Sequence, residues 1–79
     1  MKPIRFSQSA RRHRIGKAHA YYVMATGAYE FDTDPKTGAP TVVFTGPDDR
    51  GADLTVVVVE LSDRFLVIHV KPTYPKERR

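Results

Sequence analysis

The chain contains no cysteine among its 79 residues. Disulfide bonds and thiolate metal sites are therefore excluded, which suits the reducing cytoplasm. Long apolar runs are missing too, since no stretch approaches the roughly 20 residues of a membrane-spanning helix. The basic N-terminus also lacks the apolar segment that follows in a signal peptide. With 41% hydrophobic and 28% charged residues, the composition is typical of a folded protein. We therefore predict one cytoplasmic domain over residues 1–79.

Acidic residues are absent from the first 29 positions, which carry six lysines and arginines. Residues 30–63 reverse the balance with eight acids against two bases, and residues 64–79 carry five bases against one acid. Basic ends around an acidic middle are typical of a surface for a polyanion, or for an acidic protein that mimics one. Taken alone, such charge more often marks a solvated basic helix and a frayed tail. Residues 72–79 are predicted to form a flexible basic tail.

Two neighbouring stretches, residues 54–61 (LTVVVVEL) and 64–71 (RFLVIHVK), predict an antiparallel β-hairpin. With a two-residue link, one face is almost wholly apolar, as expected under a helix, and consists of Thr55, Val57, Val59, Leu61, Arg64, Leu66, Ile68 and Val70. The other face has an apolar centre with charged edges, as expected for a partner surface, and consists of Leu54, Val56, Val58, Glu60, Phe65, Val67, His69 and Lys71. A longer loop that shifted the register by one residue would change these pairs.

The N-terminal third predicts a strand followed by two helices. The expected elements are a strand or extended arm at residues 3–6, a short basic helix at 10–14 and a second helix at 17–26. Gly16 separates the helices, and Gly27 ends the second one. An apolar stripe at spacings of three and four residues supports the second helix, and it consists of Ala20, Val23, Met24 and Gly27.

The middle of the chain alternates turns with one strand. Residues 32–40 (DTDPKTGAP) and 46–53 (GPDDRGAD) have turn chemistry, and residues 41–45 (TVVFT) predict a strand. The expected fold is α+β, with an N-terminal strand and two short helices packed on one face of a three- to four-stranded antiparallel sheet.

Four stretches carry a family pattern. Residues 6–24 (FSQSARRHRIGKAHAYYVM) combine a strand, a basic helix, a break and a second helix, and residues 44–54 (FTGPDDRGADL) open the hairpin. The chain closes with residues 67–72 (VIHVKP) and 73–79 (TYPKERR). This pattern resembles small BrnT-type toxins, which have a G-x-T-x-D-G-R-x-L hairpin motif, a last strand such as I-I-S-A-R and an A-T-x-x-E-R-R ending. It also resembles short uncharacterised chains with an R-R-I-G…V-M start and a V-I-H-V-x-P finish.

The resemblance implies a RelE-like fold and the toxin of a type II toxin–antitoxin pair, which cleaves or blocks RNA and is silenced by a bound antitoxin. Arg50 matches the arginine of the hairpin motif and Lys71 the basic residue of the last strand. The terminal acid–arginine run is matched by Glu77, Arg78 and Arg79. His69 departs from the family, which commonly has a small hydroxyl residue there, and the relatives continue into a further helix.

Metal-independent RNA cleavage needs a base near the 2′-hydroxyl, a cation for the phosphate and an acid for the leaving oxygen. His69 and Lys71 lie two apart on one strand and so share a face. We expect His69 to act as general acid or base, with Lys71 and Arg50 binding phosphate. The alternative is a histidine that packs beside Val56 at the edge of the sheet. Further phosphate contacts are expected from the tail, through Tyr74, Arg78 and Arg79.

A basic and aromatic cluster near the N-terminus is the second predicted RNA contact, and consists of Arg11, Arg12, Arg14, Lys17 and Tyr21. A plain amphipathic helix is the alternative. His13 and His19 lie six apart across Gly16, which is not the spacing of a helical metal pair, so no metal or other cofactor is expected.

Two functions follow from these features. The first is an RNA-acting toxin, active in association with the ribosome or alone, and neutralised by an antitoxin on the open hairpin face. The second is a non-enzymatic interaction module or homodimer that uses the same face. The residues expected to contact either partner are Val56, Val58, Glu60, Phe65 and Val67.

Overall fold

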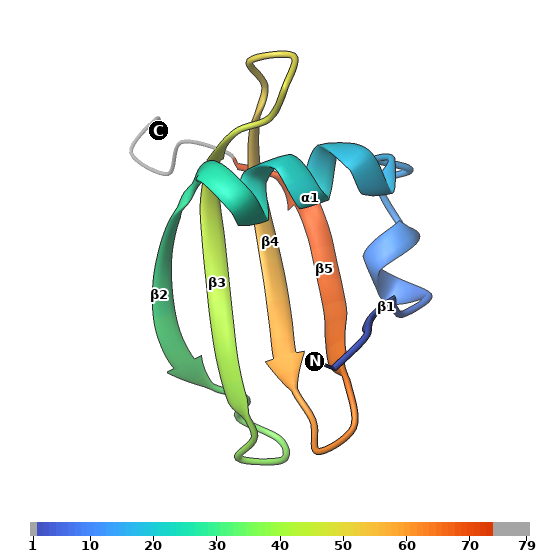
Figure 1. The fold of residues 1–79 in the computed structure, drawn as a ribbon, viewed down its shortest axis with the longest axis vertical. Coiled ribbons are helices and arrows are strands. Elements are labelled where there is room, and N and C mark those ends of the chain that lie inside the picture. Colours follow the sequence, from blue (N-terminus) through green and yellow to red (C-terminus); the bar gives the residue numbers. More distant parts are fainter. Residues whose placement is uncertain (1, 74–79) are drawn as a thin grey trace.

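The structure is a computed structural model that describes residues 2–73, and the fold is α+β (Figure 1). One α-helix, one 3-10 helix and five strands follow each other along the chain: β1 (Ile4–Phe6), η1 (Ser9–Arg11), α1 (Lys17–Thr26), β2 (Ala28–Thr33), β3 (Pro40–Pro47), β4 (Asp53–Glu60) and β5 (Phe65–Pro72). The sheet order is β1-β5-β4-β3-β2. Neighbouring strands are antiparallel, except that β1 runs parallel to β5.

The predicted helix at residues 17–26 is confirmed, and Gly27 ends it. The Gly27 N–H donates to the Val23 carbonyl at 2.7 Å. A Cβ atom on Gly27 would lie only 2.6 Å from the Thr45 carbonyl oxygen. Glycine is therefore needed here because the end of α1 lies directly against β3.

The basic helix predicted at residues 10–14 is reduced to the single 3-10 turn η1. Arg14 has a φ of 55°, in the left-handed region, so the chain leaves the helical conformation at this residue. Three arginines within four positions also repel one another on a short helix. Only α1 lies across β3 and β4, while η1 contacts β5. The sheet is correspondingly larger than predicted, since it gains β2 and the parallel pairing of β1.

The core lies between α1 and one face of β4 and β5. Its centre is formed by fully or almost fully buried side chains, namely Ala20, Val23, Leu54, Val56, Val58, Val67 and Val70. Ala20 has no exposed surface, so its small side chain lets the helix approach the valines closely. Burial of these apolar side chains is the main favourable contribution to folding.

A β-bulge in β5 decides which residues face this core. Val67 pairs with Val58 and His69 pairs with Val57, so Ile68 is an extra residue opposite β4. Val67 and Val70, three positions apart, consequently point into the same core. The Ile68 carbonyl, released from the ladder, accepts a hydrogen bond from Ser9 Oγ at 2.8 Å.

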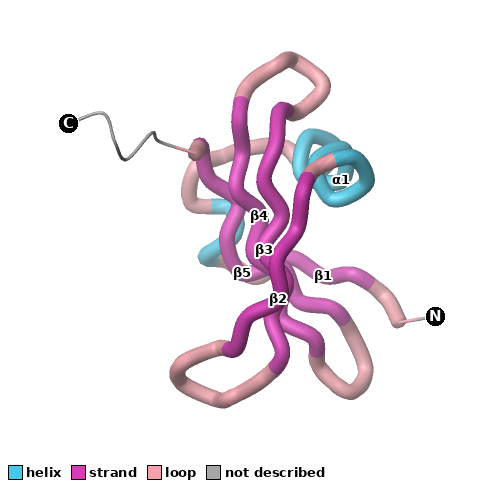
Figure 2. Tube along the Cα trace, turned by 90° about the vertical axis from the view of Figure 1, so that its left-hand side faces the viewer, coloured by secondary structure: helices cyan, strands magenta, loops and turns pink. Residues whose placement is uncertain are grey.

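The hairpin pairs as predicted up to the bulge, with Glu60 opposite Phe65 and Val58 opposite Val67, but there the helix side covers the face that was predicted to be open. Beyond the bulge, His69 and Lys71 lie on the uncovered face, as predicted. Val56, Val58 and Val67 of that face are buried in the core. Phe65 is half-buried beneath the Lys2 ammonium, and Glu60 binds Lys2 at 2.8 Å. Figure 2 shows α1 on one side of the strands. The expectation that a partner contacts Val56, Val58 and Val67 is wrong, because these side chains are buried in the protein's own core. Glu60 is exposed and Phe65 is half-buried, so their contact with a partner stays a prediction.

The C-terminal end of the described chain belongs to the sheet. Pro72 is the last residue of β5, and the Thr73 N–H donates to the Asp53 carbonyl at 3.0 Å. The first residues of the predicted tail are therefore held, and positions 74–79 lie outside the described residues.

Replacing Leu54 with alanine is expected to lower the free energy of unfolding by about 2–5 kcal/mol, because a buried side chain is lost and a cavity is left behind. Leu66 is the matched control, since it is only half-buried on the opposite face, and Leu66→Ala is expected to cost about 1 kcal/mol. Urea denaturation of both variants measures the difference. A larger loss for Leu66→Ala would contradict the assignment of the faces.

Candidate functional site

The uncovered face of the sheet forms a groove with a volume of about 700 Å³. Apolar side chains from the three central strands and from Leu61, directly after β4, make its floor: Val43, Val57, Val59, Leu61, Leu66 and Ile68. Polar residues border it, with Ser9 and His69 from the β5 side and residues 32–37 from the end of β2 and the following loop. Most of the floor residues are only partly buried. The groove thus offers apolar surface that nothing in the described chain covers.

His69 reaches this groove because of the bulge. An unbroken register would have paired His69 with Val56 on the helix-covered face, whereas the extra residue Ile68 pairs it with Val57. Lys71 follows two positions later and pairs with Thr55, so it shares the uncovered face. Both side chains are exposed.

The rest of the predicted catalytic group lies elsewhere. Arg50 belongs to the loop between β3 and β4, where it binds Asp48. Among residues 2–73, His69 has no side-chain hydrogen bond. The catalytic role of His69, Lys71 and Arg50 stays a prediction.

The loop between β3 and β4 is organised around one buried carboxylate. Asp48 is only 3% exposed and accepts four hydrogen bonds. Two come from the backbone N–H groups of Arg50 and Ala52, at 2.8 and 3.0 Å, and two from Arg50 Nε and Nη2, at 3.0 and 2.6 Å. The Arg50 side-chain bonds, opposed by desolvation and helped by the backbone donors, lower the pKa of Asp48 from 3.8 to about 2.

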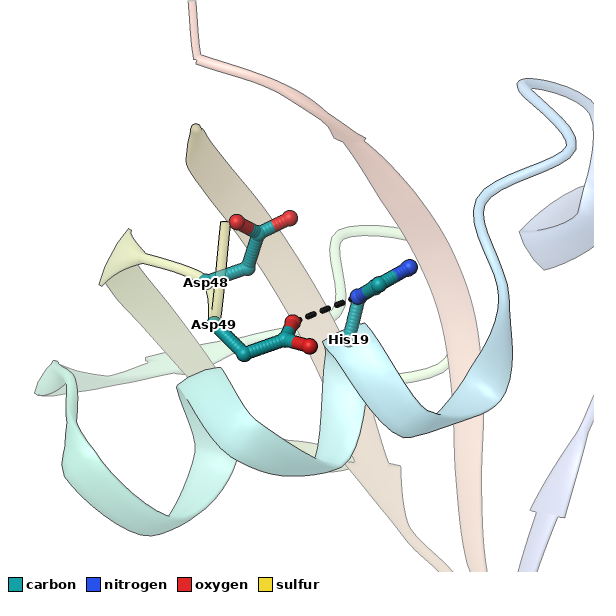
Figure 3. Close-up of side chains that lie close together, drawn as sticks. All are labelled: His19, Asp48 and Asp49. Carbon is teal, nitrogen blue, oxygen red and sulfur yellow. Dashed lines mark hydrogen bonds and ion pairs between the residues drawn. The ribbon is translucent and has the colours of Figure 1, made fainter. Parts of the chain in front are cut away.

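The next residue of this loop binds the helix. His19, in the first turns of α1, lies with its Nδ1 2.5 Å from Asp49 Oδ1 (Figure 3). The other nitrogen of the ring points away from both carboxylates. The His19 side chain is 25% exposed and that of Asp49 46%. We refer to His19 and Asp49 as the His–Asp pair.

The sequence analysis did not identify the His–Asp pair. The two residues lie 30 positions apart, so no local spacing connects them. His19 was compared only with His13, and Asp49 was included only in a predicted turn. The available signals were a histidine early in a helix and an acidic, glycine-containing turn between two strands, and neither predicts contact by itself.

A metal ion would fit this cluster poorly. Ligand atoms of His19, Asp48 and Asp49 lie within 4.8 Å of one another. However, the Asp48 carboxylate is already engaged by four donors, two of them from a guanidinium. A bound metal would have to displace Arg50. The group that is available for chemistry in this cluster is therefore the His–Asp pair.

The predicted N-terminal cluster is exposed. Its four cations are Arg11, Arg12, Arg14 and Lys17, and within residues 2–73 none of them forms an ion pair. The Lys17 ammonium lies 5.3 Å above the ring of Phe6. Tyr21 packs edge-on against the same ring at 5.6 Å and remains 42% exposed. The cluster therefore presents free positive charge beside aromatic surface. The predicted tail contacts Tyr74, Arg78 and Arg79, with Glu77, lie outside the described residues.

The edge strand β2 carries a second apolar surface that the sequence analysis did not single out. Phe31 is 78% exposed and Tyr29 60%, and they border a shallow hollow with Val42 and Phe44. The rings of Tyr29 and Phe31 lie edge to face at 5.5 Å. This patch lies on the same side of the sheet as α1, beyond the part that the helix covers.

Asp48 is expected to make the stability of the protein depend on acid pH. Its pKa is lower in the folded chain than in the unfolded chain, so its stabilising contribution is present above pH 4 and is lost as the pH falls through about 2. Asp48→Asn should flatten the stability profile between pH 4 and pH 2. Urea denaturation at several pH values measures this slope, with Asp34→Asn in another loop as the control. An unchanged slope in Asp48→Asn would contradict the role of Asp48.

No protein-family model matches the chain, and no curated protein or solved structure matches it either. Within residues 2–73, no helix is both long and apolar enough to span a membrane. A functional assignment therefore rests on the groups described above and on the resemblance carried by the sequence.

Proposed function

We propose that the protein is a toxin-like, RNA-acting component of a type II toxin–antitoxin pair, with a RelE-like arrangement of its helix and sheet. The observation that carries the proposal is the cluster of four exposed cations from the end of η1 to the first residue of α1, none of which has a carboxylate partner within the described residues. Unpaired lysines and arginines attract the phosphates of a nucleic acid and gain affinity by releasing its counterions. Aromatic surface beside them suits single-stranded RNA, whose bases are free to stack.

The groove on the uncovered sheet face is the place we assign to the antitoxin. Its floor is apolar, whereas the cation cluster lies at the start of α1 and at η1. An antitoxin segment with apolar side chains would bury this floor and gain the free energy of desolvation. RNA and antitoxin would then use different kinds of surface, one charged and one apolar.

A second candidate function is a non-enzymatic protein-interaction module, which is favoured by the same groove. Six apolar side chains converge there without cover from the described chain, and exposed apolar patches of this kind mark interaction surfaces. An interaction module would bind its partner at the groove but would not need the cations near α1. The two functions therefore differ in what happens when those cations are removed.

Controlled expression of the wild type without a partner protein is expected to arrest growth and to degrade RNA. The test variant is Arg11→Gln/Arg12→Gln, and the matched control is Lys36→Gln/Arg64→Gln, which removes the same charge from other exposed positions. Arrest should weaken in the test variant only. With purified protein and a single-stranded RNA, the slope of log affinity against log salt should fall by about 1.4 for two lost phosphate contacts. Normal growth and intact RNA with folded wild-type protein would favour the interaction module.

A further inference from the structure

We propose that the His–Asp pair is the acid–base centre of RNA cleavage by this protein. The inference rests on the proposed function and assigns its chemistry to His19, oriented by Asp49, in place of His69. Three features of the cluster argue for it: the proton arrangement in the pair, the rigidity of its two supports and the guanidinium beside it.

The hydrogen bond determines which nitrogen of His19 can act as a base. An ionised carboxylate only accepts hydrogen bonds, so Nδ1 carries the proton and donates it to Asp49. In the neutral imidazole Nε2 is then the nitrogen without a proton, and it points away from both aspartates (Figure 3). A side chain 25% exposed leaves room for a hydroxyl to approach. Asp49 thus selects the tautomer and orients the ring, as the carboxylate does in a Ser-His-Asp triad.

Both members of the pair are held by buried neighbours. His19 precedes Ala20, which has no exposed surface under the helix, and Asp49 follows Asp48, which is 3% exposed and accepts four hydrogen bonds. The helix and the loop therefore meet at a point where neither backbone moves freely. Such rigid support is what a base needs to remain in reactive geometry.

A phosphate-binding group lies next to the pair. Arg50 follows Asp49 directly and uses Nε and Nη2 to bind Asp48, and its Nη1 group has no hydrogen-bond partner among residues 2–73. The Arg50 side chain is 53% exposed. Lys17 lies two positions before His19 on the exposed first turn of α1. His69, by contrast, faces an apolar groove and has no orienting side-chain partner among the described residues.

The step that this arrangement supports is transesterification within RNA. His19 Nε2 removes the proton of a 2′-hydroxyl, and the oxygen attacks the adjacent phosphorus. The O2′–P bond forms as the P–O5′ bond breaks, and the leaving 5′ oxygen takes a proton from water. The products are a 2′,3′-cyclic phosphate and a 5′-hydroxyl, and His19 then returns its proton to the hydroxide left by that water. The guanidinium of Arg50 stabilises the charge that develops on the phosphate.

The test is single-turnover cleavage of an end-labelled single-stranded RNA by the full chain, free and with added ribosomes, in the presence of EDTA. His19→Ala should reduce the rate constant by about 100-fold or more, as expected for loss of a general base. His19→Asn should be equally inactive, because an amide cannot act as the base. Its side-chain N–H can still donate a hydrogen bond to Asp49, so this variant should stay active if the pair only stabilises the fold. Added imidazole should restore part of the activity of His19→Ala. His69→Ala tests the competing assignment, because only a catalytic His69 predicts that this variant loses cleavage.

Asp49 is a positioning residue, and its variant is tested through the rate constant and the half-saturating concentration. Asp49→Asn should lower the rate constant at saturating protein while the half-saturating concentration stays unchanged, because RNA binding does not depend on it. An RNA with a single 2′-deoxy position at the cleavage site should resist the wild type, and the normal product should carry a 2′,3′-cyclic phosphate.

Each opposing result overturns a defined part of the proposal. If the wild type cleaves RNA and His19→Asn cleaves it at the same rate, the assignment to the His–Asp pair is overturned. Loss of cleavage in EDTA or in His69→Ala would overturn the same assignment. In each case the RNA-acting function would remain in place. Absence of cleavage and of growth arrest by folded wild-type protein would overturn the proposed function itself, and the pair with it.

Discussion

The extra residue in β5 is the constraint on which the rest of the molecule depends. Because Ile68 is inserted opposite β4, Val67 and Val70 both enter the core beneath α1, although three positions separate them. The same insertion turns His69 and Lys71 toward the uncovered face. Its carbonyl, no longer used by β4, is satisfied by Ser9 and so attaches η1 to the edge of the sheet. One local irregularity thus determines the core, the groove and the position of the N-terminal segment.

A second constraint operates at the opposite end of α1 from Gly27. The buried Asp48 organises the loop between β3 and β4 through four accepted hydrogen bonds, and Asp49 then reaches the first turns of the helix. Burying a carboxylate is costly unless it is paired and hydrogen-bonded. Arg50, two positions after Asp48 in the sequence, forms the ion pair that offsets this cost. The helix is therefore attached to the sheet at both ends, by close backbone approach at Gly27 and by side chains at His19.

Much of the local structure could be predicted from the sequence. The bounds of α1 follow from Gly16 and Gly27 around an apolar stripe, and the hairpin follows from two valine-rich runs. The edge strand β2 was missed, although Tyr29 and Phe31 alternate with two acids, because all six of its residues are exposed and none contributes to the core.

The bulge in β5 and the contact between His19 and Asp49 could not be predicted from the sequence. Val56, Val57, Val58 and Val59 are identical residues, so they fit either face of the sheet, and no alternation indicates which face the helix covers or where a bulge falls. The face expected to be open was consequently the covered one. The contact between His19 and Asp49 depends on how the helix crosses the sheet, which is tertiary information that neither local segment carries.

The parallel pairing of β1 with β5 also constrains how the molecule comes into being. Ile4 lies beside Phe65 and Phe6 beside Val67, so β1 pairs with a strand that follows β2, β3 and β4 in the sequence. The core of α1 is likewise completed by residues of β4 and β5. Contacts of such long sequence separation form slowly. During synthesis the N-terminal third must therefore wait until β5 has left the ribosome before the core can form.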